Sequence, residues 1–133
     1  LVIGKGMGAL WALYAAALDP RIKSLVCHGG LLSYRSLTAT DRYLHGANVF
    51  ILDVLNHFDL PQVAAAVAGR RLSLLSPVDA MQQPIDVAAA AEAYRWTQDT
   101  YIAAGAEDRF HVSGMNPDQS LAAQYLRLLG QND

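Results

Sequence analysis

Three glycines at alternating positions near the start of the chain have a spacing that could form a binding or catalytic site. Gly4, Gly6 and Gly8 follow the apolar residues 1–3 and precede a run of helix-forming residues. This order predicts a strand, a sharp turn and the first turn of a helix, because glycine adopts backbone conformations that other residues avoid. The unpaired N–H groups at a helix N-terminus can bind an anion. The turn therefore predicts a site for a phosphate, or for a reactive side chain beside an oxyanion hole.

Two sequence motifs fit this turn. Gly4, Gly6 and Ala9 satisfy the dinucleotide pattern G-x-G-x-x-G/A, which predicts a nucleotide-binding module through residues 4–9. That pattern also needs an acid after the next strand to bind the ribose hydroxyls, and the next apolar stretch ends at His28 without a carboxylate. The second motif is G-x-S-x-G, a turn that presents a nucleophilic serine. Residues 4–8 keep both outer glycines of that motif and have Gly6 at the serine position.

The order of apolar segments predicts an α/β fold. Strands are expected at the opening stretch and at 22–28, 71–76 and 109–113, and helices at 9–18, 63–68, 84–104 and 117–129. Residues 31–60 have no regular period, which predicts irregular structure with short helices. Asp59 is expected to cap the helix that follows, with Pro61 in its first turn. The alternation predicts one domain over residues 1–133, with a parallel sheet of about four strands, helices on both faces and functional loops at the carboxyl ends of the strands.

Composition narrows the classes of partner and cofactor. With 10 basic and 12 acidic residues the formal charge is −2, so neither nucleic acid nor an anionic membrane is expected as a partner, although a local basic pocket stays open. The longest apolar stretch, 8–18, is shorter than the roughly 20 residues of a membrane span. The single cysteine, Cys27, has apolar neighbours and is interpreted as a buried small hydrophobe. His28, His45 and His57 do not have the spacing of metal ligands, so no metal or other cofactor is expected.

Several separate segments carry a resemblance to a known family. They are AAALDPRIK at 15–23, GLLSYRSL at 30–37, HFDLP at 57–61 and LLSPVDAM at 74–81. In these segments the chain resembles the C-terminal half of an α/β-hydrolase and is most similar to the bacterial acetyl-xylan-esterase-like and prolyl-oligopeptidase-like hydrolases. The resemblance covers nearly the whole length and implies the same fold. It also implies that Val2 and Ile3 form an exposed apolar strand edge, which would pair with a missing N-terminal region or with another chain.

The resemblance implies positions for a catalytic triad. The nucleophile falls on Gly6, the acid on Asp79, and the histidine on Met115, where a Gly-His pair would be expected. Of the three, only the acid is retained. Because glycine has no hydroxyl to attack an ester and methionine has no imidazole to take the proton, hydrolysis by the inherited mechanism is not expected.

Other residues near these positions have a functional and a structural interpretation. Met7 follows the nucleophile position, so its N–H is expected in the oxyanion hole. Lys5 could direct a cation into the pocket, or it could be a solvated lysine or a salt-bridge partner. His28 ends a strand and could face the site, or it could be a hydrogen-bonded or exposed histidine. Asp79 follows Pro77 in a strand-to-helix loop, where an aspartate often caps backbone N–H groups.

Three functional hypotheses follow. In the first, the chain is a non-catalytic α/β-hydrolase-like domain that keeps a pocket for a small ester or a carbohydrate. In the second, it is a working hydrolase that uses another nucleophile, such as Ser33 or Ser36, or groups from a missing N-terminal half; both serines are also interpreted as helix caps or surface hydroxyls. In the third, it is the nucleotide-binding module. His111 could replace the missing base, but its position inside a predicted strand favours structural burial.

Overall fold

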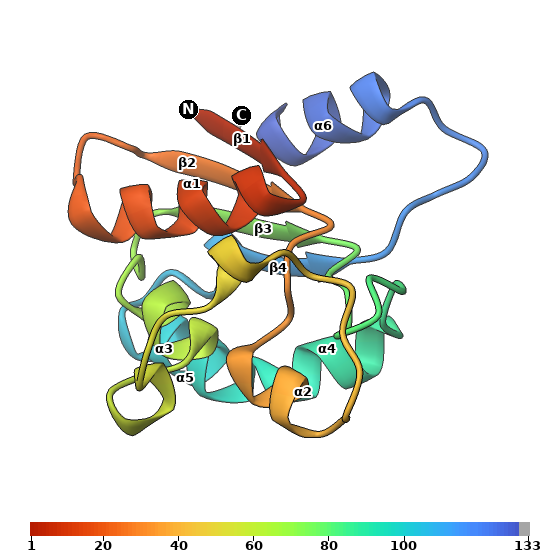
Figure 1. Ribbon diagram of the computed structural model, residues 1–133. Coiled ribbons are helices and arrows are strands. Elements are labelled where there is room, and N and C mark those ends of the chain that lie inside the picture. The colour runs from red at the N-terminus through yellow and green to blue at the C-terminus, as the bar shows by residue number, and fades with distance from the viewer. Residues whose placement is uncertain (131–133) are drawn as a thin grey trace.

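A four-stranded parallel sheet forms the centre of the molecule (Figure 1). The computed structural model describes residues 1–130. The sheet order is β1-β2-β3-β4, and each neighbouring pair is parallel. The prediction of an α/β fold with about four parallel strands is confirmed. The strands are β1 (Val2–Lys5), β2 (Ser24–His28), β3 (Arg71–Leu75) and β4 (Phe110–Ser113).

The opening strand lies at an edge of this sheet. Within residues 1–130, β1 pairs with β2 alone, and β4 forms the opposite edge. Leu1 is 67% exposed and Ile3 is 41% exposed. The predicted apolar strand edge is therefore present in the described part of the chain.

Helices cover both faces of the sheet, as predicted. Side chains alternate along a strand, so Leu25 and Cys27 of β2 point to one face and Val26 to the other. The first face packs against α1 (Met7–Leu18), α3 (Leu60–Ala65), α4 (Val87–Ala93) and α5 (Arg95–Ala103). The second face packs against α6 (Leu121–Gly130), which Figure 1 shows apart from the other helices. No helix within residues 1–130 is long and apolar enough to cross a membrane.

The cysteine lies in the core on the first face. Cys27 is 6% exposed, and its Sγ lies 3.5 Å from the carbonyl oxygen of Ala9. Burial raises the pKa of the thiol to about 12. Burial thus disfavours the thiolate, which is the reactive form, and the interpretation of Cys27 as a buried hydrophobe is confirmed.

The segment between β2 and α3 is irregular with short helices, as predicted. It contains α2 (Tyr34–Thr38) and two 3-10 helices, η1 (Ala47–Val49) and η2 (Val54–Asn56). Asp59 caps α3 with a capping box that includes Gln62, and Pro61 lies in the first turn. Both predictions about this helix start are confirmed, although α3 begins at Leu60 and ends at Ala65, earlier than expected.

The prediction of a single helix over 84–104 is wrong, because the helix is interrupted at Tyr94. It forms α4 and α5, and α4 begins at Val87, where the Asp86 carboxylate accepts the N–H groups of Ala88 and Ala89. Tyr94 has φ −104° and ψ 16°, which lies outside the helical region. Its side chain is 2% exposed and its hydroxyl donates to the Leu32 carbonyl oxygen at 2.8 Å. Packing of this ring in the core prevails over the helix propensity of its neighbours. A 3-10 helix, η3 (Glu107–Arg109), then leads into β4.

The last helix begins later than predicted, at Leu121 instead of residue 117. The fully buried amide of Gln124 explains this, because it holds residues 116–119 as a loop. Its Oε1 accepts the N–H of Asn116, and its Nε2 donates to the carbonyl oxygens of Asn116 and Gln119. The Ser120 hydroxyl then accepts the N–H of Ala123 and caps the helix.

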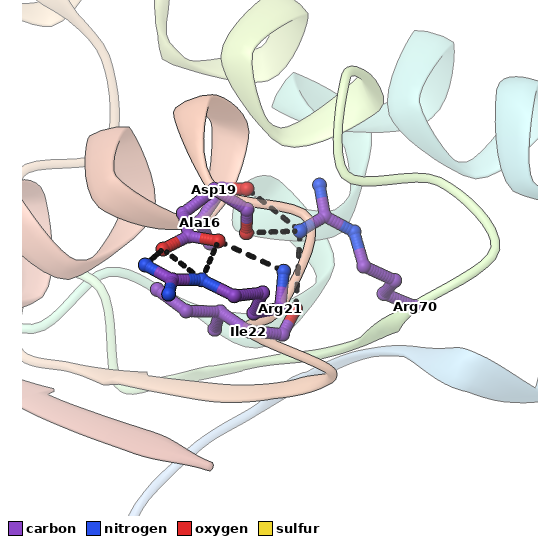
Figure 2. A network of polar contacts seen from close by, with 5 residues as sticks. All are labelled: Ala16, Asp19, Arg21, Ile22 and Arg70. Atoms are coloured by element: carbon purple, nitrogen blue, oxygen red, sulfur yellow. Dashed lines mark hydrogen bonds and ion pairs between the residues drawn. The ribbon is translucent and has the colours of Figure 1, made fainter.

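One arginine connects the end of α1 to the start of β3 (Figure 2). The Nη1 of Arg70 donates to the carbonyl oxygens of Ala16, Asp19 and Ile22 at 2.7, 3.1 and 3.0 Å. These include carbonyl groups at the C-terminal end of α1, where the helix dipole favours a positive charge. The arginine therefore stabilises the connection between α1 and β2.

Candidate functional site

The glycine turn has the sharp strand-to-helix geometry predicted from its sequence. Gly6 lies between β1 and α1 with φ 57° and ψ −122°, a conformation that favours glycine. Its N–H donates to the His28 carbonyl oxygen at 2.8 Å, and its own carbonyl accepts the N–H of Ala9. A Cβ built on Gly6 would have no atom within 4 Å. The position has room for a side chain, and this chain has none there.

A cavity of about 380 Å³ lies beside this turn. Four parts of the chain form it: the turn with α1, the loop after β2, the segment around η1, and the loop after β3. Polar groups on three side chains, those of His45, Asn48 and Gln82, lie among apolar ones. The N–H of Met7 belongs to the first turn of α1 and has no partner within the helix. The lining residues are Gly6, Met7, Leu10, Gly29, Leu31, His45, Gly46, Asn48, Val49, Val78 and Gln82.

His45 is a member of the cavity wall that the sequence did not identify as a site residue. Its Nε2 lies 2.8 Å from the carbonyl oxygen of Asp79. Because a carbonyl oxygen only accepts, Nε2 must be the donor, and Nδ1 of the neutral ring is then an acceptor. The Nε2 of Gln82 donates to the Leu44 carbonyl oxygen at 2.8 Å. These contacts hold the irregular segment against the loop after β3 and so close the cavity.

Asp79 uses its carboxylate within its own loop. The Oδ1 atom accepts the N–H of Met81 at 2.8 Å and that of Gln83 at 2.9 Å. The structural interpretation of Asp79, as a cap of backbone N–H groups, is thus confirmed. Asp79 itself is not among the residues that line the cavity; Val78 and Gln82 of the same loop are.

The structure places Met115 in the loop after β4, at the same end of the parallel strands as Gly6 and Asp79. Its side chain is 40% exposed. The next residue, Asn116, is hydrogen-bonded to Gln124 of α6. Met115 does not line the cavity beside Gly6.

Neither Lys5 nor His28 lines this cavity, although each directly precedes a lining residue, Gly6 or Gly29. The two residues are opposite each other in neighbouring strands. Lys5 is exposed, whereas His28 is 8% exposed. The Nδ1 of His28 lies 2.7 Å from the hydroxyl oxygen of Tyr125, and the rings meet edge to face. His28 therefore connects β2 to α6, in agreement with its structural interpretation.

This histidine makes the stability of the fold depend on pH. Burial lowers the pKa of His28 below its usual value near 6.5, and the charge of Lys5 lowers it further. Between the two pKa values the unfolded chain binds a proton that the folded chain does not, so the free energy of unfolding rises with pH across this interval and then levels off above about 6.5. We expect His28→Gln to remove this slope, as measured by urea unfolding from pH 4.5 to 7.5. The exposed His57→Gln is the control, and an unchanged slope in His28→Gln would contradict the assignment.

The remaining sequence candidates lie away from the cavity. The Ser33 hydroxyl accepts the N–H of Ser36, and the Ser36 hydroxyl donates to the Ser33 carbonyl oxygen. Ser33 therefore caps α2, and Ser36 lies in its first turn with its hydroxyl bonded to the backbone of Ser33. His111 is half-buried on β4 and lines a different cavity, against α4 and α5. Within residues 1–130, no three His, Cys, Asp or Glu side chains lie close enough together to hold a metal ion.

The site is therefore a largely apolar cavity with three polar side chains, beside a strand-to-helix turn that lacks a nucleophilic side chain. Of the residues singled out in the sequence, the structure brings Gly6 and Met7 to this cavity, and it adds His45, Asn48 and Gln82. Comparison with known proteins adds no family to this description: no family model, no curated protein and no solved structure gives a significant match to the chain.

Proposed function

We propose that this chain is a non-catalytic domain of the α/β-hydrolase type that binds a small ester or carbohydrate in the cavity beside Gly6. The observation that carries the proposal is the conformation of Gly6. The turn adopts the strained geometry that a nucleophile elbow needs, and the reactive hydroxyl is absent from it. Sequence resemblance and strand order support the same interpretation, because the nucleophile, acid and histidine positions all follow the carboxyl ends of strands in one parallel sheet.

The residues around the cavity support binding without turnover. Acyl transfer needs a nucleophile and a base that takes its proton. Met115 supplies no base, and the Oδ1 atom of Asp79 accepts two backbone N–H groups of its own loop. What remains is suited to recognition: the N–H of Met7 can donate to a carbonyl oxygen, and Asn48 and Gln82 can pair with hydroxyl groups. A volume of about 380 Å³ is within the range of small-molecule sites.

The test of this proposal measures turnover and binding separately. Hydrolysis of p-nitrophenyl acetate is expected to be no faster with the protein than with its Asp79→Ala variant. Binding of acetylated xylobiose, followed by NMR, is expected to shift the amide signals of Met7 and Gly29. Met7→Trp should fill the cavity and abolish these shifts, whereas Met115→Trp, the same change outside the cavity, should keep them. Turnover that depends on Asp79, or binding that Met7→Trp leaves intact, would contradict the proposal.

The other two hypotheses predict different results in the same experiments. A hydrolase that used Ser33 or Ser36 would be labelled there by a fluorophosphonate probe, although both hydroxyls are engaged in α2. A dinucleotide site would be stabilised by millimolar NADH, although the lining of the cavity includes no carboxylate for the ribose hydroxyls. The partner expected along the β1 edge remains a prediction, and Ile3 and Leu1 are the exposed apolar residues that it would cover.

A further inference from the structure

A second cleft lies at the other end of the sheet, where β2 and β3 begin. It has a volume of about 520 Å³ and is bordered by the start of β2, the turn before β3 and η3. Four of its seven lining residues are cations and one is an acid. The lining thus carries a formal charge of +3 in a chain whose total is −2. The lining residues are Lys23, Ser24, Gly69, Arg70, Arg71, Asp108 and Arg109.

No cation of this cleft forms an ion pair within 4.0 Å with a carboxylate of the described chain, although the charges of Arg70 and Lys23 act on the Asp19 carboxylate from a longer distance. Within residues 1–130, ion pairs join Arg21 to Asp19, His57 to Asp53 and Arg95 to Glu92, and none involves a cation of the cleft. Asp108 lines the cleft but pairs with no cation within 4.0 Å. Cations held this close together repel one another, so an anion between them would be stabilising.

Backbone contacts hold two of the guanidinium groups in place. Arg70 is fixed through Nη1, and Figure 2 shows its other terminal nitrogen pointing away from the three carbonyl groups. Arg109 is fixed in the same way, because its Nη1 donates to the Gly69 carbonyl oxygen at 2.7 Å. Positioned guanidinium groups lose less side-chain entropy when a ligand binds, which favours recognition.

The strand residues of the cleft supply further donors. Ser24 and Arg71 face each other across β2 and β3. The Ser24 hydroxyl and the Nε of Arg71 are both buried without a hydrogen-bond partner in the described structure. Hydroxyl and guanidinium groups are the usual donors to phosphate oxygens, and a compact set of them with Lys23 matches a group that carries two negative charges.

We propose that this cleft binds the phosphate group of a small molecule. The site is separate from the cavity beside Gly6, since it lies at the amino ends of the strands whereas that cavity lies at their carboxyl ends. The cations are gathered in one cleft at the end of the sheet, which suits a compact phosphate better than the extended backbone of a nucleic acid.

Inorganic pyrophosphate is the probe for this site. Isothermal titration at constant ionic strength is expected to give saturable binding, and sodium chloride at the same ionic strength is expected to give none. Arg71→Gln and Lys23→Gln should each weaken the affinity by about tenfold or more, because each removes a charged hydrogen bond. Arg42→Gln, which removes an exposed cation outside the cleft, should leave the affinity unchanged.

Further measurements check that the variants are folded and distinguish a soluble phosphate from other phosphate-bearing ligands. Circular dichroism checks that each variant is folded. If Arg71→Gln does not fold, Lys23→Gln still tests the site, because Lys23 is exposed and its replacement is not expected to disturb the fold. Vesicles of phosphatidylcholine with phosphatidate distinguish a lipid phosphate from a soluble one. Equal binding by all variants, or binding of single-stranded RNA that pyrophosphate does not displace, would overturn the proposal. Met7→Trp should leave pyrophosphate binding intact, so the two sites are tested independently.

Discussion

Replacing Gly4 by alanine is expected to lower the free energy of unfolding by about 3 kcal/mol or more. The reason is the close approach of β1 to the start of α1. A Cβ on Gly4 would clash with the carbonyl oxygen of Gly8, and it would lie 2.6 Å from the carbonyl carbon of that residue and 2.7 Å from the Cα of Ala9. All three are backbone atoms, so the clash is relieved only if α1 moves away from the sheet. Such a movement would displace Met7 and the wall of the cavity.

The same substitution at Gly8, four residues later, is the matched control. A Cβ on Gly8 has no atom within 4 Å outside its own helix. Because alanine is a better helix former than glycine, Gly8→Ala is expected to raise the free energy of unfolding by up to about 1 kcal/mol. Urea unfolding of both variants measures the contrast. Similar effects of the two changes would mean that the contact between Gly4 and the start of α1 is not what fixes the turn.

Local signals in the sequence are sufficient to predict much of this fold. The strands are short apolar runs, and Gly or Pro residues lie near most of their ends, as at Pro20 before β2 and Gly69 before β3. The cap of α3 could be predicted because Asp59 and Pro61 act on residues next to them. The break at Tyr94 could not, because residues 87–103 contain no Gly or Pro that would signal a break and the contact made by the Tyr94 side chain is with Leu32, far away in the sequence.

Part of the candidate site could likewise be predicted from local sequence signals, and part of it could not. The turn at Gly6 could be predicted, since strand, glycines and helix are adjacent in the chain. The wall formed by His45 and Asn48 could not, because residues 31–60 have no period that would orient a side chain. The bond from His45 to Asp79 and the bond from Gln82 to Leu44 are tertiary contacts without a local signal. Sequence spacing likewise could not show that Lys23, Arg71 and Arg109 border one cleft.

Asp59→Ala is expected to lower the free energy of unfolding by about 3 kcal/mol. Asp59 lies at the end of the irregular segment 31–60 and helps to hold it in place. Its carboxylate serves two helices at once. The Oδ1 atom accepts the N–H groups of Tyr34 at 2.6 Å and Leu60 at 2.7 Å, and Oδ2 accepts that of Arg35 at 3.1 Å. Removal of the carboxylate leaves the N–H groups of Tyr34, Arg35 and Leu60 without this acceptor, whereas Ser33 still caps α2 through the N–H of Ser36.

Asp86→Ala is the control, because Asp86 caps α4 alone through two N–H groups and its loss is expected to cost about 1 kcal/mol. Hydrogen exchange then locates the damage. In Asp59→Ala the amides of Tyr34, Arg35 and Leu60 should exchange faster while those of β2 and β3 stay protected, because the sheet does not depend on this carboxylate. If Asp59→Ala and Asp86→Ala cost the same, the two helix starts are not coupled. If they are coupled, the Asp59 carboxylate joins the two ends of the segment that includes η1 and His45 of the cavity wall, in addition to the bonds of His45 and Gln82 that hold this segment against the loop after β3.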